Sequence, residues 1–271
     1  MLKQRVITAI ILAVLFLSAV FYLNKTGWAV LVALMVLQGA REWVTLAGMA
    51  KMAGKAYIAI LLAAYVAMLA MHEHLSSADK FQLQMAVYGA ATLFWLLLVP
   101  LWLKNIWRTR NQGLLAVIGA LLLLPTALAM LDLRAAGPWW LLAVMALVWM
   151  ADIAAYFAGR KFGKHKLAPN VSPGKTWEGA AGAMVGVLLY MLLVLWQGGM
   201  LNHIELLVLA MFGVAISIIG DLFESAIKRQ AGMKDSGTLL PGHGGLLDRI
   251  DALTSTLPIS SMLLIILNFI K

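Results

Sequence analysis

Long apolar runs recur along the whole chain, and each approaches the roughly 20 residues that a helix needs to cross about 30 Å of hydrocarbon. The mean hydropathy of +0.90 and the 63% hydrophobic content exclude an ordinary soluble domain. The sequence lacks the short alternating apolar and polar segments of a membrane β-barrel, so helices are the expected spanning elements. We therefore predict an all-α, polytopic integral membrane protein with about nine transmembrane helices. The predicted spans are 6–23, 28–46, 56–71, 83–103, 112–132, 138–158, 179–197, 204–220 and 252–270.

The Lys and Arg residues predict the orientation of these spans, because cation-rich loops stay on the cytoplasmic side of a membrane. With nine spans and a cytoplasmic N-terminus, 17 of the 21 cations fall inside, and four fall outside: Lys25, Lys80, Arg134 and Lys271. The net charge of +9 is largely explained by this bias and by attraction to anionic lipids, so it requires no nucleic acid. The first span resembles a secretory signal peptide, but no clear cleavage site follows it before Asn24, and we keep it as a membrane helix.

The 12 acidic residues divide into two groups. Five lie near span ends, where we expect solvated helix termini: Glu42, Glu73, Asp79, Asp132 and Glu205. The other seven lie in or beside two loops that the topology places on one membrane face: Asp152, Glu178, Asp221, Glu224, Asp235, Asp248 and Asp251. This division predicts an N-terminal transmembrane scaffold, residues 1–135, and a C-terminal catalytic part, residues 136–271, whose polar loops face the cytoplasm. Tryptophans such as Trp28, Trp43, Trp102, Trp107, Trp139 and Trp140 are expected to be anchors at the membrane interface.

A segment near the C-terminus is dense in charge and glycine, which lipid does not easily accommodate. On a continuing helix, Asp221, Ser225 and Lys228 share one face. Asp248 and Asp251 are three residues apart at the start of the last span, where the helix dipole favours anions. Each alone could be a solvated helix end or a cap, but three carboxylates at one depth repel one another unless cations lie between them. Oxygen ligands suit magnesium, and the absence of cysteine and of paired histidines disfavours zinc.

Other polar residues in the same half are predicted to hold phosphate. Glycines in the loop around His243 permit positive φ and a close backbone approach to an anion, although no Walker motif occurs. His243 itself could position the loop, bind phosphate or carry a proton. Ser172 and Pro173 are typical of a helix start, which would put Lys175 in the first turn, where a cation is unfavourable unless an anion also binds. Asp152, inside the sixth span, is a functional candidate because a carboxylate there is costly.

Residues 225–251 closely resemble the phosphatidate cytidylyltransferase family. The pattern is Ser225-x-x-Lys228-Arg229-x4-Lys234-Asp235-x-Gly237-x3-Pro241-Gly242-His243-Gly244-Gly245-x2-Asp248-Arg249-x-Asp251. The upstream sequence SPGKTWEG, residues 172–179, is also similar to a family element. The long pattern shows no departure from the family. Because the number of predicted spans also resembles that of the family, the resemblance extends to essentially the whole chain.

This resemblance implies transfer of a cytidylyl group from CTP to phosphatidic acid, giving CDP-diacylglycerol and pyrophosphate. It implies a Mg²⁺ cofactor, with a monovalent cation such as K⁺ as a helper. It also implies a homodimer among the lipids of a bacterial inner membrane, with the active site facing the cytoplasm.

The expected roles of the site residues follow as hypotheses. The metal is assigned to Asp221, Asp248 and Asp251, with Asp152 as a further candidate. The catalytic group comprises Asp221, Lys228, Arg229, Asp248 and Asp251. The substrate contacts are Lys228, Arg229, Lys234 and Lys175 for phosphates, Ser225, His243, Gly244 and Gly245 for orienting the nucleotide, and Ser172, Asp235 and Arg249 for other substrate atoms.

Two other activities fit parts of the pattern. A membrane kinase that uses CTP, acting on a polyprenol-type alcohol, would need similar groups but would transfer the γ-phosphoryl group. A transporter also has many spans and buried carboxylates, but the acidic residues here gather at one membrane face and not at mid-membrane. The position of the label transferred from CTP separates the two enzymes, and ion flux in vesicles would identify a transporter.

Overall fold

The computed structural model describes residues 2–239 and 244–270, with the side chains of residues 2–9 and 73 outside this description. Its main helices are α1 (Leu2–Tyr22), α2 (Lys25–Leu46), α3 (Lys51–His74), α4 (Ser77–Leu93), α5 (Val99–Asn105), α6 (Gln112–Ala136), α7 (Pro138–Phe162), α8 (Trp177–Gln197), α9 (Ile204–Gln230) and α10 (Leu247–Ile266). A π-helical turn, η1 (Phe94–Leu98), joins α4 to α5. Between α7 and α8, the strands β1 (Lys166–Ala168) and β2 (Ser172–Thr176) form an antiparallel hairpin in which Lys166 lies opposite Thr176.

Most of these helices are suited to a membrane. Within the described residues, eight helical stretches are long and apolar enough to cross one, with α4, η1 and α5 counted together. The apolar part of α1 whose side chains are described, Ile10–Tyr22, is shorter. These stretches follow the order of the predicted spans and confirm the polytopic all-α fold. The chain is a multi-pass membrane protein.

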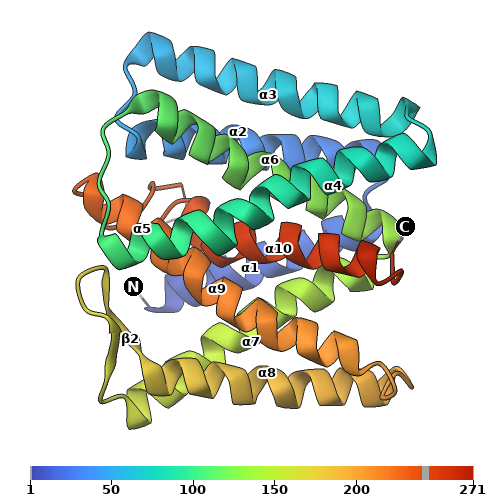
Figure 1. The fold of residues 1–271 in the computed structure, drawn as a ribbon, viewed down its shortest axis with the longest axis vertical. Coiled ribbons are helices and arrows are strands. Elements are labelled where there is room, and N and C mark those ends of the chain that lie inside the picture. Colours follow the sequence, from blue (N-terminus) through green and yellow to red (C-terminus); the bar gives the residue numbers. More distant parts are fainter. Residues whose placement is uncertain (1, 240–243, 271) are drawn as a thin grey trace.

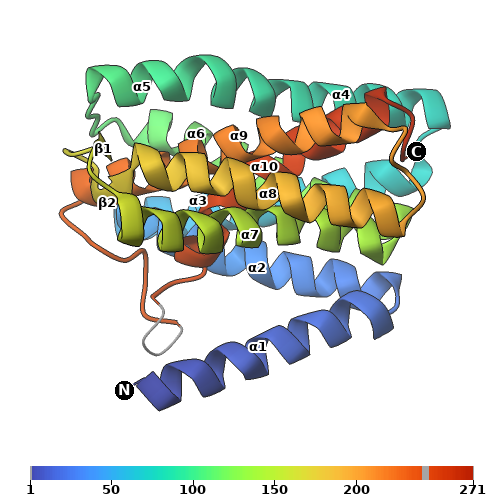
Figure 2. The same cartoon turned by 90° about the horizontal axis from the view of Figure 1, so that it is seen from below.

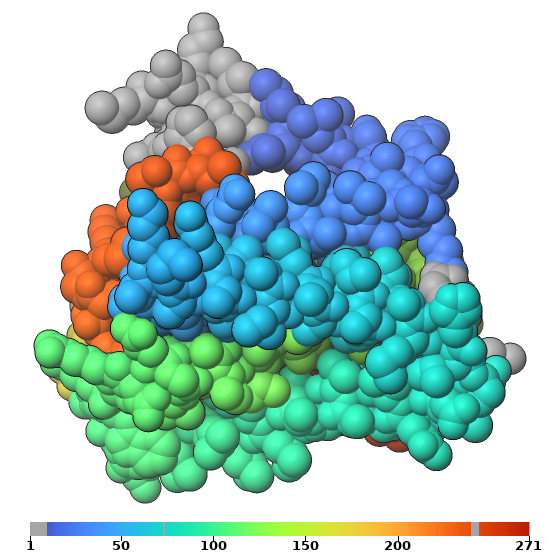
Figure 3. Space-filling model, turned by 90° about the horizontal axis from the view of Figure 1, so that it is seen from above, coloured from blue at the N-terminus to red at the C-terminus, as the bar shows by residue number. Residues whose placement is uncertain are grey.

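The helices run between two ends of the molecule (Figure 1). One end carries the β1–β2 hairpin, the end of α5 and the end of α9, and the other carries the α3–α4 and α8–α9 connections. At the first end, the surface near the end of α9 lies beside that of α3 (Figure 3). Helix α1 lies at the edge of the bundle next to α2 (Figure 2). The two polar segments that were predicted to share a face therefore lie at the same end.

The turn η1 directs two aromatic side chains into the core. Phe94 and Trp95 form edge contacts with Phe223 of α9, with ring centroids 5.5 and 5.6 Å apart. Trp95 Nε1 also donates a hydrogen bond to the carbonyl of Thr254 on α10 at 3.2 Å. A π turn widens a helix locally and redirects its side chains. These contacts hold α9 and α10, which carry the polar residues, against the N-terminal helices.

Three scaffold tryptophans lie inside the bundle, so the prediction that they are interface anchors is wrong. Trp28 and Trp43 are buried and donate their indole N–H groups to the carbonyls of Met130 and Leu115, at 3.1 and 2.7 Å. Trp102 is also buried, in contact with the aromatic group around η1. A satisfied indole N–H allows the large apolar ring to fill the core.

Asp132 of α6 is also buried, at 4% exposure, so the prediction of a solvated helix end is wrong for this residue. His72 Nε2 lies 2.8 Å from Oδ1. Gln84 and Tyr88 donate to Oδ2 at 2.8 and 2.6 Å. These side chains from α3 and α4 replace the water that a buried carboxylate would otherwise need.

The helix start predicted at Ser172 is wrong. Ser172–Thr176 instead form β2, whose backbone pairs with β1. Helix α8 begins only after this strand, where Thr176 Oγ1 accepts a hydrogen bond from Gly179 N at 3.1 Å. A hydroxyl cap is present at Thr176, four residues after Ser172. The helix cannot begin earlier, because the backbone of residues 172–176 pairs with β1. Lys175 therefore lies on a strand and not in the first turn of a helix.

Helices α7 and α8 pack closely because small residues line the surface between them. A Cβ added at Gly182 would lie 2.2 Å from the Cβ of Ala158, and one added at Gly186 would lie 2.4 Å from the Cβ of Ala154. Small residues four apart on both helices allow membrane helices to approach. This contact sets the spacing of the two helices that form one wall of the site.

Gly182→Val should force α7 and α8 apart and lower the free energy of unfolding by about 1–3 kcal/mol, as overpacking does in a tight core. The matched control is Gly89→Val on α4, where an added Cβ meets no atom within 4 Å. Both changes place the same β-branched residue in a helix. Thermal unfolding in detergent measures the difference, and equal midpoints for the two variants would contradict the close packing of α7 on α8.

Candidate active site

A cavity of about 510 Å³ lies between α7, α8, α9 and the hairpin. Small residues such as Ala155, Gly159 and Gly179 form part of its wall. Its polar lining comprises Asp152, Tyr156, Arg160, Ser172, Lys175, Thr176, Ser217 and Asp221. The cavity is thus the place where the hairpin segment meets the polar end of α9.

Lys175 and Asp221, which both line the cavity, form an ion pair. Lys175 Nζ lies 2.5 Å from Asp221 Oδ2, and Ser225 Oγ donates to Asp221 Oδ1 at 3.3 Å. Asp152 interacts electrostatically with both members of the pair and with Arg249. Strand β2 therefore brings a cation to the carboxylates of α7 and α9. Helix α9 continues past Lys228, so Asp221, Ser225 and Lys228 share one helix face, as predicted.

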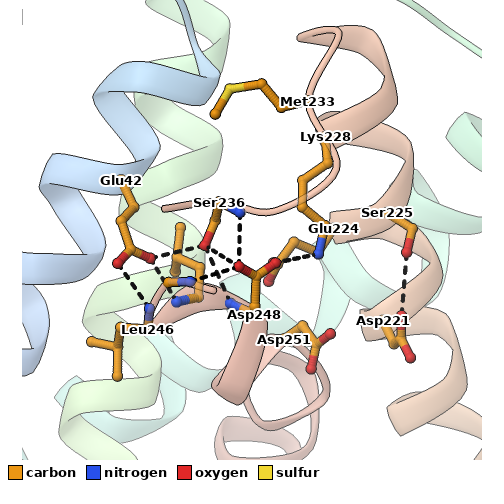
Figure 4. A network of polar contacts seen from close by, with 12 residues as sticks. Glu42, Asp221, Glu224, Ser225, Lys228, Met233, Ser236, Leu246, Asp248 and Asp251 are labelled. Atoms are coloured by element: carbon orange, nitrogen blue, oxygen red, sulfur yellow. Dashed lines mark hydrogen bonds and ion pairs between the residues drawn. The ribbon is translucent and has the colours of Figure 1, made fainter. Parts of the chain in front are cut away.

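Lys228 is only 8% exposed and pairs with two carboxylates (Figure 4). Its Nζ lies 2.6 Å from Asp248 Oδ1 and 3.1 Å from Glu224 Oε1. Glu224 precedes it by one turn on α9, whereas Asp248 comes from α10. A buried ammonium needs such partners, because an unpaired ion in a protein interior costs several kcal/mol.

The loop before α10, whose described residues are 231–239 and 244–246, contacts Asp248 from both of these parts. Ser236 N and Gly245 N each donate to Asp248 Oδ2 at 2.8 Å, and Ser236 Oγ lies 2.9 Å from the same oxygen. Gly244 has a φ of +83°, and a Cβ added there would lie 2.5 Å from Asp248 Oδ2. Here the glycines bring backbone N–H groups to a carboxylate of the protein. Their contact with the nucleotide stays a prediction.

Asp251 lies one turn after Asp248 on α10 and has other neighbours. Its carboxylate interacts electrostatically with Asp221, Lys228 and Asp152. Figure 4 shows Asp248, Asp251 and Asp221 following one another from the start of α10 toward α9. Asp251 therefore interacts both with the buried Lys228 and with the cavity carboxylates Asp152 and Asp221.

Glu42 of α2 completes the network, and the prediction that it is a solvated span end is wrong. Glu42 is only 5% exposed. Leu246 N and Leu247 N donate to its two oxygens at 2.8 Å each, and Ser236 Oγ donates to Oε2 at 2.9 Å. Its position near the end of an apolar run is shared by solvated acids, so the sequence pattern alone does not separate Glu42 from them.

Comparison with known proteins shows the family of this chain. A model of the cytidylyltransferase family matches residues 3–267. The chain belongs to the cytidylyltransferase family. It is 43% identical to a phosphatidate cytidylyltransferase of Pseudomonas aeruginosa over 277 aligned residues, which cover 97% of each chain. It is 36% identical to a phosphatidate cytidylyltransferase of Haemophilus influenzae over 283 residues, which cover 96% of this chain and 98% of the relative.

The site residues predicted for this cytidylyltransferase family member fall into three groups. Those that line the cavity are Asp152, Ser172, Lys175 and Asp221. Those in the network next to it are Ser225, Lys228, Gly244, Gly245, Asp248 and Asp251. The exposed ones are Arg229, Lys234, Asp235 and Arg249, and His243 lies outside the described residues. Arg160 lines the cavity but was not predicted, because it was one of several cations in its segment.

The predicted metal ligands do not meet as one group. Within the part of the chain that the structure describes, no three acidic or histidine side chains are arranged to hold a metal ion. Asp221 is paired with Lys175, and Asp248 is surrounded by Lys228 and loop N–H groups. The magnesium assignment therefore stays a prediction.

Lys228→Met should lower the free energy of unfolding by about 3–5 kcal/mol, because Glu224 and Asp248 would lose their buried cation. Lys104→Met is the control, since Lys104 is exposed at the end of α5, and it should change stability by less than about 0.5 kcal/mol. Unfolding in detergent measures both variants. A loss no larger than that of the control would mean that the two carboxylates do not depend on Lys228.

Proposed function

We propose that this protein transfers the cytidylyl group of CTP to phosphatidic acid, forming CDP-diacylglycerol and pyrophosphate. The observation that carries the proposal is the cavity at one end of the membrane bundle, lined by cations and carboxylates together. A nucleotide from water and a phosphate from lipid can both reach such an end. The similarity to phosphatidate cytidylyltransferases over nearly the full length supports the same activity.

In this reaction, a phosphate oxygen of phosphatidic acid attacks the α-phosphorus of CTP. A new P–O bond forms there, and the bond from the α-phosphorus to the oxygen shared with the β-phosphorus breaks. Pyrophosphate leaves with that oxygen and its charge. A phosphate monoester is already anionic near pH 7, so the protein needs no strong general base. Its task is to position the reactants and to neutralise charge.

The cavity residues suit this task. Lys175 and Arg160 can neutralise phosphate oxygens, and both belong to the lining. Tyr156 Oη accepts a hydrogen bond from Arg160 Nη1 at 3.1 Å, which orients the guanidinium group. Planar guanidinium groups bind phosphate through two parallel hydrogen bonds. We assign Lys175 and Arg160 to phosphate binding.

The carboxylates suit a magnesium cofactor. Asp152 and Asp221 line the cavity, and Asp251 interacts electrostatically with both. Mg²⁺ takes one or two such carboxylates and completes its shell with waters and substrate phosphates. When bound, it would supply positive charge for the phosphate oxygens and for the leaving group. Asp248 would become a ligand only by exchanging its contact with Lys228.

We further propose that the protein lies in a bacterial inner membrane with the cavity end facing the cytoplasm. Most Lys and Arg residues lie at helix ends and connections on the cavity side, which supports this orientation. The similar proteins named above are bacterial. A homodimer and a helper cation such as K⁺ rest on the resemblance of the sequence pattern. Light scattering corrected for detergent tests the dimer.

Labelled CTP tests the reaction directly. With Mg²⁺ and phosphatidic acid in mixed micelles, the purified protein should move an α-phosphate label into lipid and leave a γ-phosphate label in pyrophosphate. Thin-layer chromatography of the lipid phase measures the transfer. Entry of the γ-label into a lipid alcohol would identify a kinase, and ion flux without CTP turnover would identify a transporter.

Asp221→Asn and Asp251→Asn should each lower kcat by at least about 100-fold, as loss of a group that organises transition-state charge does. Asp79→Asn is the control, because Asp79 is an exposed carboxylate at the start of α4, and it should keep wild-type turnover. Initial rates are measured across a Mg²⁺ titration. Full magnesium-dependent turnover in either site variant would remove that residue from the metal assignment.

A further inference from the structure

Helix α10 has no capping side chain of its own at its N-terminus. The cap comes from α2, because Glu42 Oε1 accepts from Leu246 N and Glu42 Oε2 accepts from Leu247 N, both at 2.8 Å. The first N–H groups of a helix have no partner within the helix, and the helix dipole favours an anion there. Glu42 therefore fixes the start of a helix that is far from it in sequence.

We infer that Glu42 is a positioning residue for the transfer reaction, acting through Ser236 and the start of α10. The inference rests on the proposed function, since it assigns a role in that reaction. Asp248 and Asp251 lie within the first turns of α10, so the start of the helix decides where both carboxylates stand. Glu42 does not line the cavity, and so it acts through these residues.

Described residues on both parts of the loop before α10 lie close to the Glu42 carboxylate. A Cβ added at Gly245 would lie 2.5 Å from Glu42 Oε2, and one added at Gly237 would lie 3.1 Å from Oε1. A side chain at Gly245 would therefore displace the Glu42 carboxylate, and one at Gly237 would crowd it. Gln38, one turn earlier on α2, donates to Oε1 at 2.8 Å and holds the carboxylate from its own helix.

Ser236 links Glu42 to Asp248. Its Oγ lies 2.9 Å from Glu42 Oε2 and 2.9 Å from Asp248 Oδ2. A hydroxyl has one proton to donate, so it serves one of the two carboxylates at a time. A change at Glu42 therefore alters the hydrogen bonding of Asp248, which in turn holds Lys228 at 2.6 Å. Figure 4 shows this series of contacts from Glu42 to Lys228.

Asp132 offers a matched comparison, because it is as buried as Glu42 but has other partners. Its contacts are His72, Gln84 and Tyr88, which lie on α3 and α4. None of the three belongs to the loop before α10. Removing the charge of Asp132 should therefore affect stability and leave the reaction unchanged.

The test is Glu42→Gln, which keeps the side-chain volume but turns an amide N–H₂ group toward backbone N–H donors. In the purified, folded protein, kcat for CDP-diacylglycerol formation should fall about 10- to 100-fold, as small misplacements of reacting groups cause. The KM for CTP should change by less than about twofold, because Glu42 does not touch the cavity. Hydrogen–deuterium exchange should become faster in residues 244–251 and stay unchanged in α6.

The control, Asp132→Asn, should keep wild-type kcat below its unfolding temperature and wild-type exchange in residues 244–251. Wild-type kcat or unchanged exchange in folded Glu42→Gln would overturn the inference. So would an equal loss of kcat in Asp132→Asn. If the wild-type protein forms no CDP-diacylglycerol, the proposed function fails, and the exchange data alone then decide whether Glu42 holds the helix start.

A double-mutant cycle with Ser236→Ala tests the route. If Glu42 acts through Ser236, either single change already breaks the link, and the double variant should lose less activity than the product of the two single losses. Measurement of kcat for the four proteins gives the coupling. Single losses that simply multiply would overturn the route through Ser236.

Discussion

Burial of charge among apolar helices is the constraint on which the rest of this structure depends. Lys228 would be costly in such a place without partners, and its two carboxylates come from different helices, α9 and α10. Asp248 is fixed in turn by the loop that Glu42 holds. Loss of Lys228 would leave both carboxylates without their buried cation. Helices α2, α9 and α10 are therefore tied together by electrostatics as well as by apolar packing.

Much of the fold could be predicted from the sequence, because hydrocarbon leaves a chain few alternatives to helices of about 20 residues. The shared face of Asp221 and Ser225 could also be predicted, since helical spacing fixes the direction of side chains. The start of α8 could not be predicted. Ser172 satisfies the local preference for a helix cap, but pairing of β2 with β1 is a contact with another segment, and it prevails.

The buried acids show a second limit of sequence analysis. Glu42 and Asp132 stand near the ends of apolar runs, as solvated acids also do, and only their partners distinguish them. The donors to Glu42 come from the loop before α10, far along the chain. The predicted boundary between the scaffold and the catalytic part, after residue 135, separates Glu42 from these donors. The N-terminal part therefore contributes a side chain to the organisation of the site.

The ion pair on the hairpin has a thermodynamic consequence. Lys175 has one ammonium group, and it pairs with Asp221 at 2.5 Å. A phosphate that takes this ammonium leaves Asp221 with an uncompensated negative charge, and a cation that takes Asp221 leaves Lys175 with an uncompensated positive one. Each ligand thus creates an attractive place for the other, and such coupling is reciprocal by thermodynamic necessity. Under the proposed function, nucleotide and metal would therefore bind cooperatively, each replacing one member of the Lys175–Asp221 ion pair.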